Sequence, residues 1–139
     1  MLLNIAIAAF LMVVTTAIHA GGMVLAMRTV RTEESLLRRV LQTKVQKVGG
    51  IVLLMFLASL LEVLVWAVTF LVVNAIEGFE RALYFSMVTF TTLGYGEIVL
   101  GEEWRLLASF AAANGIIMFG WTTAIVLAVV QRTYFPERW

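Results

Sequence analysis

The chain has 139 residues, 62% of them hydrophobic, and a net charge of only +1. Its mean hydropathy of +0.97 excludes a soluble domain of this length, because too few polar residues remain to cover the outside. The sequence holds no cysteine and one histidine, which excludes disulfides and Cys-ligated metals. Nothing in it supports an enzyme, a cofactor, a nucleic-acid partner or a small-molecule substrate.

Three apolar stretches are long enough to cross a membrane. A helix needs roughly 20 mostly apolar residues to span about 30 Å of hydrocarbon, and residues 2–27, 49–73 and 106–130 meet this requirement. A shorter apolar run at residues 82–90 cannot span. The sequence therefore predicts an all-α membrane protein with three transmembrane helices, in contact with membrane lipids.

The first span, residues 1–27, is predicted to remain as an N-terminal transmembrane helix. Residues 17–20 loosely resemble a cleavage site, but a signal peptide needs a positively charged start, and no Lys or Arg precedes Arg28. Because the span contains no positive residue, we do not expect it to be an Arg-rich voltage sensor.

The connection between the first two spans, residues 28–48, is strongly basic. It carries six of the ten Lys and Arg residues, whereas only Arg81 and Arg105 lie between the second and third spans. Because short basic loops stay in the cytoplasm, we expect this connection and the tail, residues 132–139, to be cytoplasmic and the N-terminus to be outside. The connection is predicted to form either an amphipathic helix on the lipid surface or a cytoplasmic extension of the second span.

Two ionisable side chains lie within the spans, His19 in the first and Glu62 near the middle of the second. Such groups are costly inside a membrane and are candidates for a functional role. Counted from the cytoplasmic ends at about 1.5 Å per residue, their depths differ by roughly 5 to 10 Å. We therefore expect each to be satisfied by a neighbour such as Ser59, Thr15 or Thr16 rather than by the other.

The segment between the second and third spans is predicted to dip into the membrane and return. Residues 80–90 suit a helix of about three turns, with Glu80 near its positive N-terminal end. The non-helical backbone that follows is tolerated there only where protein buries it or where it faces water. The partial negative charge at the C-terminal end of the helix would lie beside Thr91 and Thr92 and favour a cation.

Two glycines with one residue between them follow this helix. Pointing successive carbonyls the same way requires backbone dihedrals of alternating hand, which glycine adopts without steric cost. Gly94 and Gly96 therefore allow the carbonyls of Thr92, Leu93, Gly94 and Tyr95 to face one axis, and the Thr92 hydroxyl adds a lower ring. Four chains around that axis would replace the water shell of a dehydrated cation.

The segment resembles the pore module of the tetrameric potassium channels. The run Thr-Thr-Leu-Gly-Tyr-Gly-Glu at residues 91–97 is similar to their filter signature, Thr-Val-Gly-Tyr-Gly followed by Asp, and the flanking helices agree over residues 49–131. The resemblance implies a bacterial-type pore domain with an extra N-terminal helix, a re-entrant pore helix and a filter. It further implies a homotetramer in the plasma membrane, expected to be a bacterial inner membrane, that conducts potassium passively, with K⁺ at residues 92–95.

This sequence departs from the family's filter at two positions. Leu93 stands where Val or Ile is usual, but it contributes its carbonyl, so selectivity is expected to survive. Glu97 replaces the usual Asp, which keeps the charge on a longer side chain. Tyr95 is present, whereas members of the family that also pass sodium often lose the aromatic residue there, so we favour potassium selectivity over a non-selective cation pore.

Tyr84, Val88 and Glu97 are predicted to support the filter. Tyr84 lies eight residues before Thr92, where related channels carry a Trp bonded to the Asp after their filter. We predict that Tyr84 donates a hydrogen bond to Glu97 and braces the outer mouth. The alternative is that Glu97 only raises the local cation concentration and that Tyr84 packs as an aromatic.

The third span contains two glycines, Gly115 and Gly120, where the inner helix of the resembled channels has a glycine that permits gating. They are candidates for a hinge, or else small residues that let helices approach closely. Asn114 beside them is predicted to face either a water-filled cavity or a helix interface.

Two other functions fit less of the sequence. A potassium-uptake transporter subunit has similar pore loops, but it carries four in one chain, usually with degenerate filters, whereas this chain has one intact repeat. A non-conducting regulatory protein would have no need of the Thr-Leu-Gly-Tyr-Gly run.

Overall fold

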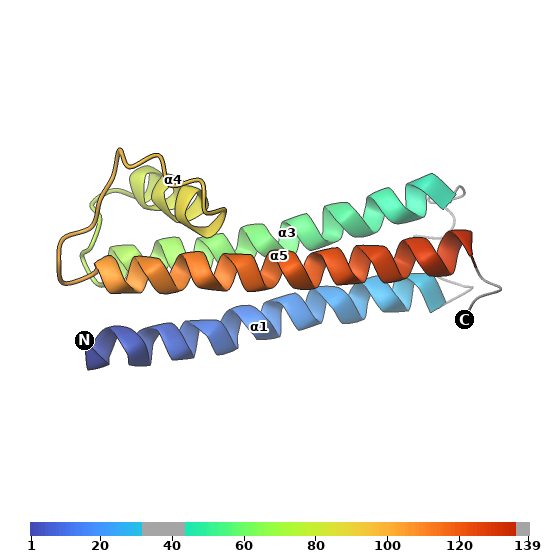
Figure 1. Cartoon of the computed structure of the whole chain (residues 1–139), viewed down its shortest axis with the longest axis horizontal. Helices are drawn as coiled ribbons and strands as arrows, with labels where there is room; N and C mark the ends of the chain where they lie inside the picture. Colours follow the sequence, from blue (N-terminus) through green and yellow to red (C-terminus); the bar gives the residue numbers. More distant parts are fainter. Residues whose placement is uncertain (32–43, 136–139) are drawn as a thin grey trace.

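The computed structural model describes residues 1–31 and 44–135. Its helices are α1 (Leu2–Arg31), α3 (Lys44–Val72), α4 (Phe79–Phe90) and α5 (Arg105–Tyr134). α1, α3 and α5 run side by side along the length of the molecule, and the short helix α4 lies at one end of this bundle (Figure 1). Within the described ranges the fold is all-α, as predicted.

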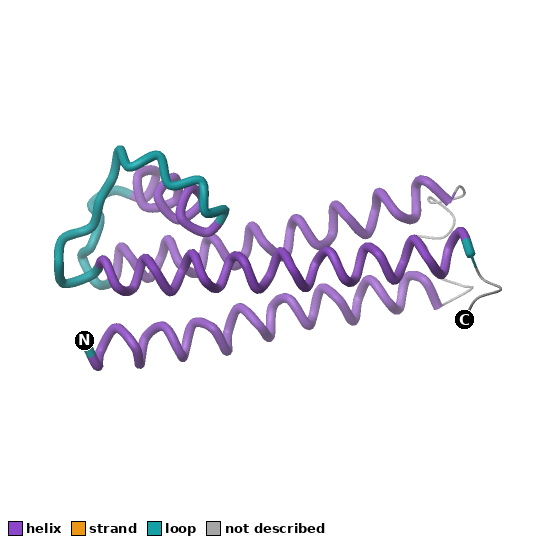
Figure 2. The backbone as a smooth tube through the Cα atoms, in the orientation of Figure 1, coloured by secondary structure: helices purple, strands orange, loops and turns teal. Residues whose placement is uncertain are grey.

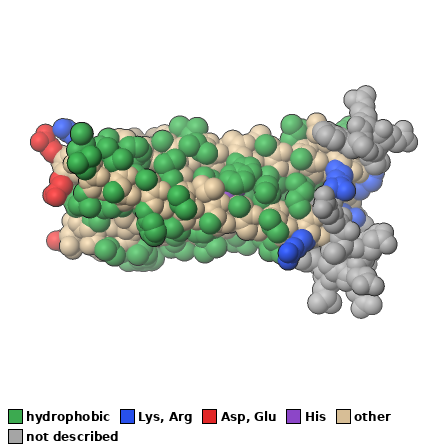
Figure 3. Space-filling model, turned by 90° about the horizontal axis from the view of Figure 1, so that it is seen from below, with side chains coloured by type: hydrophobic (Ala, Val, Ile, Leu, Met, Phe, Trp, Pro, Cys, Tyr) green, Lys and Arg blue, Asp and Glu red, His purple; other side chains and the backbone are tan. Residues whose placement is uncertain are grey.

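Three of these helices are long and apolar enough to cross a membrane: Leu2–Arg28, Lys44–Val72 and Arg105–Tyr134. This confirms the three predicted spans. The loops around α4 gather at the end of the bundle where the N-terminus lies (Figure 2). Acidic side chains gather at that end, and most of the visible Lys and Arg side chains lie at the other (Figure 3).

The basic connection, residues 28–48, is helical at both of its described ends. α1 continues to Arg31, and α3 begins at Lys44, so residues 44–48 extend the second span. The predicted amphipathic surface helix falls mainly on residues 32–43, which lie outside the described part of the chain.

α4 is held against α3 by aromatic packing and one polar contact. Phe70 of α3 and Phe85 of α4 are both buried, and their rings meet edge to face at 5.2 Å between centroids. Such pairs contribute about 0.5–1.5 kcal/mol beyond the area that they bury. In addition, the Ser86 hydroxyl donates to the Val63 carbonyl at 2.8 Å. These contacts fix the direction in which α4 runs.

The C-terminal end of α4 is seated on α5 at Gly115. A Cβ atom at this position would overlap the carbonyl of Phe90, so only glycine lets the two backbones approach this closely. Gly120 differs, because a Cβ there meets no described atom within 4 Å. α5 is a continuous helix through both glycines. Close packing therefore accounts for Gly115, whereas no contact within the described chain accounts for Gly120.

The expectation that His19 and Glu62 stay apart is wrong. His19 Nδ1 lies 2.8 Å from Glu62 Oε1, and both side chains are fully buried between α1 and α3. The two helices run in opposite directions, and side chains on a helix tilt toward its N-terminus. The tilts of His19 and Glu62 therefore converge and close the difference in depth that residue counting gave.

The contact between Gly115 and Phe90 predicts opposite effects for two similar substitutions. Gly115→Ala should lower the thermal unfolding temperature in detergent, because overpacking typically costs about 1–3 kcal/mol. Gly120→Ala has room for its methyl group and gains up to about 1 kcal/mol of helix propensity, so it should not lower that temperature. Equal unfolding temperatures for the two variants, followed by tryptophan fluorescence, would contradict the close approach at Gly115.

Candidate functional site

The candidate site is the loop that follows α4. α4 begins after Gly78 and runs inward from the end of the bundle, and the chain then returns to that end before α5 begins (Figures 1 and 2). Glu80 lies in the first turn of α4, where a negative charge complements the helix dipole. The C-terminal end of α4, with its partial negative charge, points toward the middle of the bundle.

The turn after α4 is organised around the carbonyl of Val88. The amide of Leu93 donates to Val88 O at 3.0 Å, and the amide of Gly94 donates to the same oxygen at 3.2 Å. The Thr91 hydroxyl caps the helix by donating to Met87 O at 2.8 Å. Val88 therefore holds the start of the loop through its backbone.

The loop alternates in backbone hand. Thr92, Gly94 and Gly96 have positive φ angles of 59°, 54° and 84°, and the residues between them, Leu93 and Tyr95, do not. The two glycines behave as predicted. Thr92 was missed, because the sequence gives no local signal that a β-branched residue adopts this conformation, which is uncommon for such side chains.

The carbonyl groups of this loop are available to a ligand. Among the described residues, none donates a hydrogen bond to the carbonyl oxygens of residues 92–95. Carbonyl oxygens are ligands that hard cations accept. By contrast, the described residues contain no cluster of His, Cys, Asp and Glu side chains that could hold a metal ion. A cation site in this part of the chain would thus be formed by backbone.

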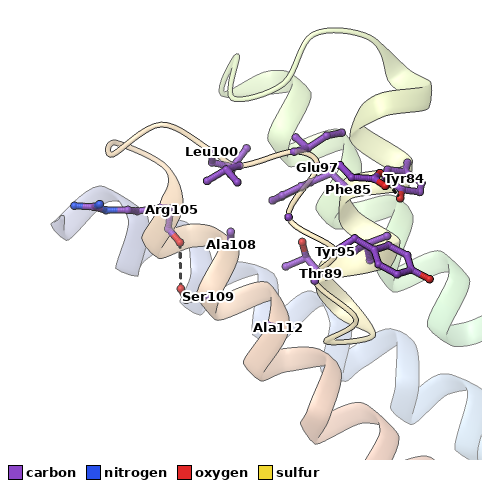
Figure 4. Close-up of a pocket in the computed structure, with 15 residues that line it drawn as sticks. Tyr84, Phe85, Thr89, Tyr95, Glu97, Leu100, Arg105, Ala108, Ser109 and Ala112 are labelled. Atoms are coloured by element: carbon purple, nitrogen blue, oxygen red, sulfur yellow. Dashed lines mark hydrogen bonds between the residues drawn. The ribbon is translucent and has the colours of Figure 1, made fainter.

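The predicted contact between Tyr84 and Glu97 is present. The Tyr84 hydroxyl donates to Glu97 Oε2 at 2.8 Å and so links α4 to the end of the loop (Figure 4). This hydrogen bond, followed by partial desolvation and the negative charge of Glu97, raises the pKa of Tyr84 above its ordinary value of 10.0. The phenol therefore stays protonated, and able to donate, at neutral pH.

A pocket of about 320 Å³ separates the loop from α5. Side chains of α4 (Tyr84, Phe85, Thr89), the loop (Tyr95, Glu97) and α5 (Ala108) line it (Figure 4). The side chains of Leu93 and Tyr95 are 54% and 65% exposed. In a single chain, the loop thus presents large apolar surfaces that no described residue covers.

A comparison with protein-family models matches an ion channel family over residues 45–132, which is more than half of the chain. The match includes α4, the loop and most of α3 and α5 and leaves α1 outside. Neither the comparison with curated proteins nor that with solved structures gives a match. The matched segment and the arrangement of the loop agree, and the chain belongs to the two-transmembrane ion channel family, that of the potassium-channel pore.

Proposed function

We propose that this chain is one subunit of a homotetrameric channel that conducts potassium passively across the plasma membrane. The observation that carries the proposal is the loop at residues 92–96, in which alternating backbone hand coincides with unpaired carbonyl oxygens. Backbone carbonyls at the depth of a membrane require a partner, because no bulk water is present to satisfy them. A permeating cation supplies that partner.

One loop provides only one side of such a site. Replacing the water shell of K⁺ takes a ring of carbonyls, which four chains around a common axis supply. The exposed side chains of Leu93 and Tyr95 support this assembly, because apolar surfaces of this size require burial against another copy. The proposed K⁺ sites are formed by the carbonyls of residues 92–95, with Gly96 completing the filter.

The electrostatics of α4 favour a cation at the inner end of the filter. The α4 dipole places partial negative charge at Phe90, next to the Thr91 cap and the loop. Four such ends would meet near the axis, where the low dielectric of the membrane strengthens their effect on a cation. An anion would be repelled at the same place.

The distribution of charge sets the proposed orientation. The end of the bundle near α4 is largely acidic, and the opposite end carries most of the visible Lys and Arg. Because basic ends stay in the cytoplasm, the loop and N-terminus would face outside, and the basic connection and C-terminal tail would face inside. The exposed apolar side chains of the three spans would face lipid or neighbouring subunits.

Potassium flux into liposomes tests the proposal through Gly94→Ala. A side chain in the left-handed region costs roughly 1–2 kcal/mol per residue, or roughly 4–8 kcal/mol over four chains, so the filter should distort. We expect the variant to assemble as the parent does but to lose potassium flux. Gly101→Ala is the matched control, because Gly101 has no positive φ and room for a methyl group, and it should conduct as the parent does. Normal potassium flux through Gly94→Ala would refute the filter assignment.

The Tyr84–Glu97 hydrogen bond predicts how steadily the channel conducts. Tyr84→Phe removes only the donor, so conduction should decay faster during sustained activity, and Glu97→Gln should have a similar effect. Because both substitutions break one interaction, the double variant should add little to either. Single-channel or macroscopic current recordings at equal expression provide the measurement.

Glu102→Gln separates bracing from surface charge. It removes one negative charge at the same end of the molecule, where Glu102 makes only a solvent-exposed pair with Arg105 at 3.5 Å. Under the bracing role it should leave the decay rate unchanged. If Tyr84→Phe conducts steadily while Glu97→Gln and Glu102→Gln both lower the current, Glu97 acts through its charge alone.

A further inference from the structure

α1 contacts α5 through buried polar side chains at two levels. At the first level, Asn114 Nδ2 donates to Thr15 Oγ1 at 3.0 Å, and both side chains are fully buried. The Thr15 hydroxyl also donates to Leu11 O of its own helix at 2.9 Å. The Asn114 side chain therefore faces the interface with α1, one of the two environments that the sequence left open.

At the second level, His19 bridges α1 to both of the other long helices. Its Nδ1 meets Glu62 of α3 at 2.8 Å, and its Nε2 meets the hydroxyl of Thr122 of α5 at 3.1 Å. The Trp121 ring packs on the imidazole at 5.2 Å between centroids. Both ring nitrogens are engaged, so the orientation of His19 is fixed.

Glu62 acts on α5 only through His19. Its Oε1 atom binds the imidazole, while its Oε2 atom is buried and has no hydrogen-bond partner among the described residues. A carboxyl group in this position is costly unless it is paired. The pairing with His19 thus holds the imidazole toward Thr122 and makes Glu62 a support for that contact.

The two levels lie on either side of Gly120. Asn114 precedes this glycine on α5 and Thr122 follows it, and no described contact explains a glycine between them. Glycine in a helix interior costs about 0.5–1 kcal/mol relative to Ala, so Gly120 is a weak point of α5. A bend at Gly120 would move Thr122 relative to Asn114 and could not keep both contacts with the single straight partner α1.

We propose that Thr15 and His19 are positioning residues that hold α5 straight across Gly120 and thereby oppose opening of the inner end of the pore. This inference rests on the proposed function for its effect on conduction. It assigns a role to α1, which lies outside the matched channel segment. Interhelical hydrogen bonds are the means by which polar side chains hold helices together in a membrane.

Adjacent threonines provide isosteric variants and matched controls. Thr15→Val and Thr122→Val each remove one hydroxyl that joins α1 to α5. Thr16 is exposed, and the exposed Thr123 hydroxyl donates to Phe119 O within its own helix, so Thr16→Val and Thr123→Val change the same chemistry away from the interface.

Single-channel recording gives the first measurement. Thr15→Val and Thr122→Val should each raise the open probability by about threefold to twentyfold, the range that the measured strengths of interhelical hydrogen bonds in membranes imply. Their potassium-over-sodium selectivity should equal that of the parent, because the filter is untouched. Thr16→Val and Thr123→Val should match the parent in both properties. An unchanged or lowered open probability in the two interface variants overturns the proposal.

A distance measurement tests the same contact without conduction. The chain has no cysteine, so Val24→Cys on α1 and Leu127→Cys on α5, both exposed, accept spin labels. Labelled chains are diluted with unlabelled cysteine-free chains so that distances within one subunit dominate. Adding Thr122→Val should broaden the distance distribution, and adding Thr123→Val should not.

The two measurements separate this inference from the function on which it rests. If the parent fails to conduct but Thr122→Val still broadens the distances, α1 holds α5 and the channel assignment is wrong. If the parent conducts potassium and Thr122→Val matches Thr123→Val in both open probability and distance, the channel assignment stands and the positioning role of α1 is refuted.

Discussion

The rest of this structure depends on one constraint: backbone polar groups that leave a helix inside a membrane must find partners. The carbonyls of residues 92–95 have none among the described residues, yet they follow a helix that points toward the middle of the bundle. The structure fixes the loop from its far side, through the Val88 carbonyl before it and the Tyr84–Glu97 contact after it. The unpaired carbonyls remain free to face an ion and neighbouring copies of the loop.

The contacts that place this loop and those that involve α1 meet on α5. Gly115 receives the end of α4, and the preceding residue, Asn114, binds Thr15 of α1. Neighbouring positions on one helix therefore face the base of the filter and the additional helix. This arrangement gives α1 a route to the pore that does not pass through the basic connection between α1 and α3.

The sequence predicted the features that depend on local chemistry. Hydrophobic length located the three spans to within a few residues at most of their ends, and the start of α4 differs by one residue, Phe79 instead of Glu80. The positive φ angles of Gly94 and Gly96 and the Tyr84–Glu97 contact also agree with prediction. The His19–Glu62 pair was not predicted, because the register between helices depends on side-chain tilt and packing, which residue counting omits. The different environments of Gly115 and Gly120 likewise arise only when α4 docks on α5.

Diffraction from crystals of the assembled protein grown in potassium would locate bound ions directly, if data were collected on both sides of the potassium absorption edge. We predict a fourfold axis, with anomalous peaks between successive rings of carbonyl oxygens from Thr92, Leu93, Gly94 and Tyr95. An assembly without that axis, or carbonyl groups turned away from it with no anomalous density between them, would contradict a potassium filter at residues 92–96.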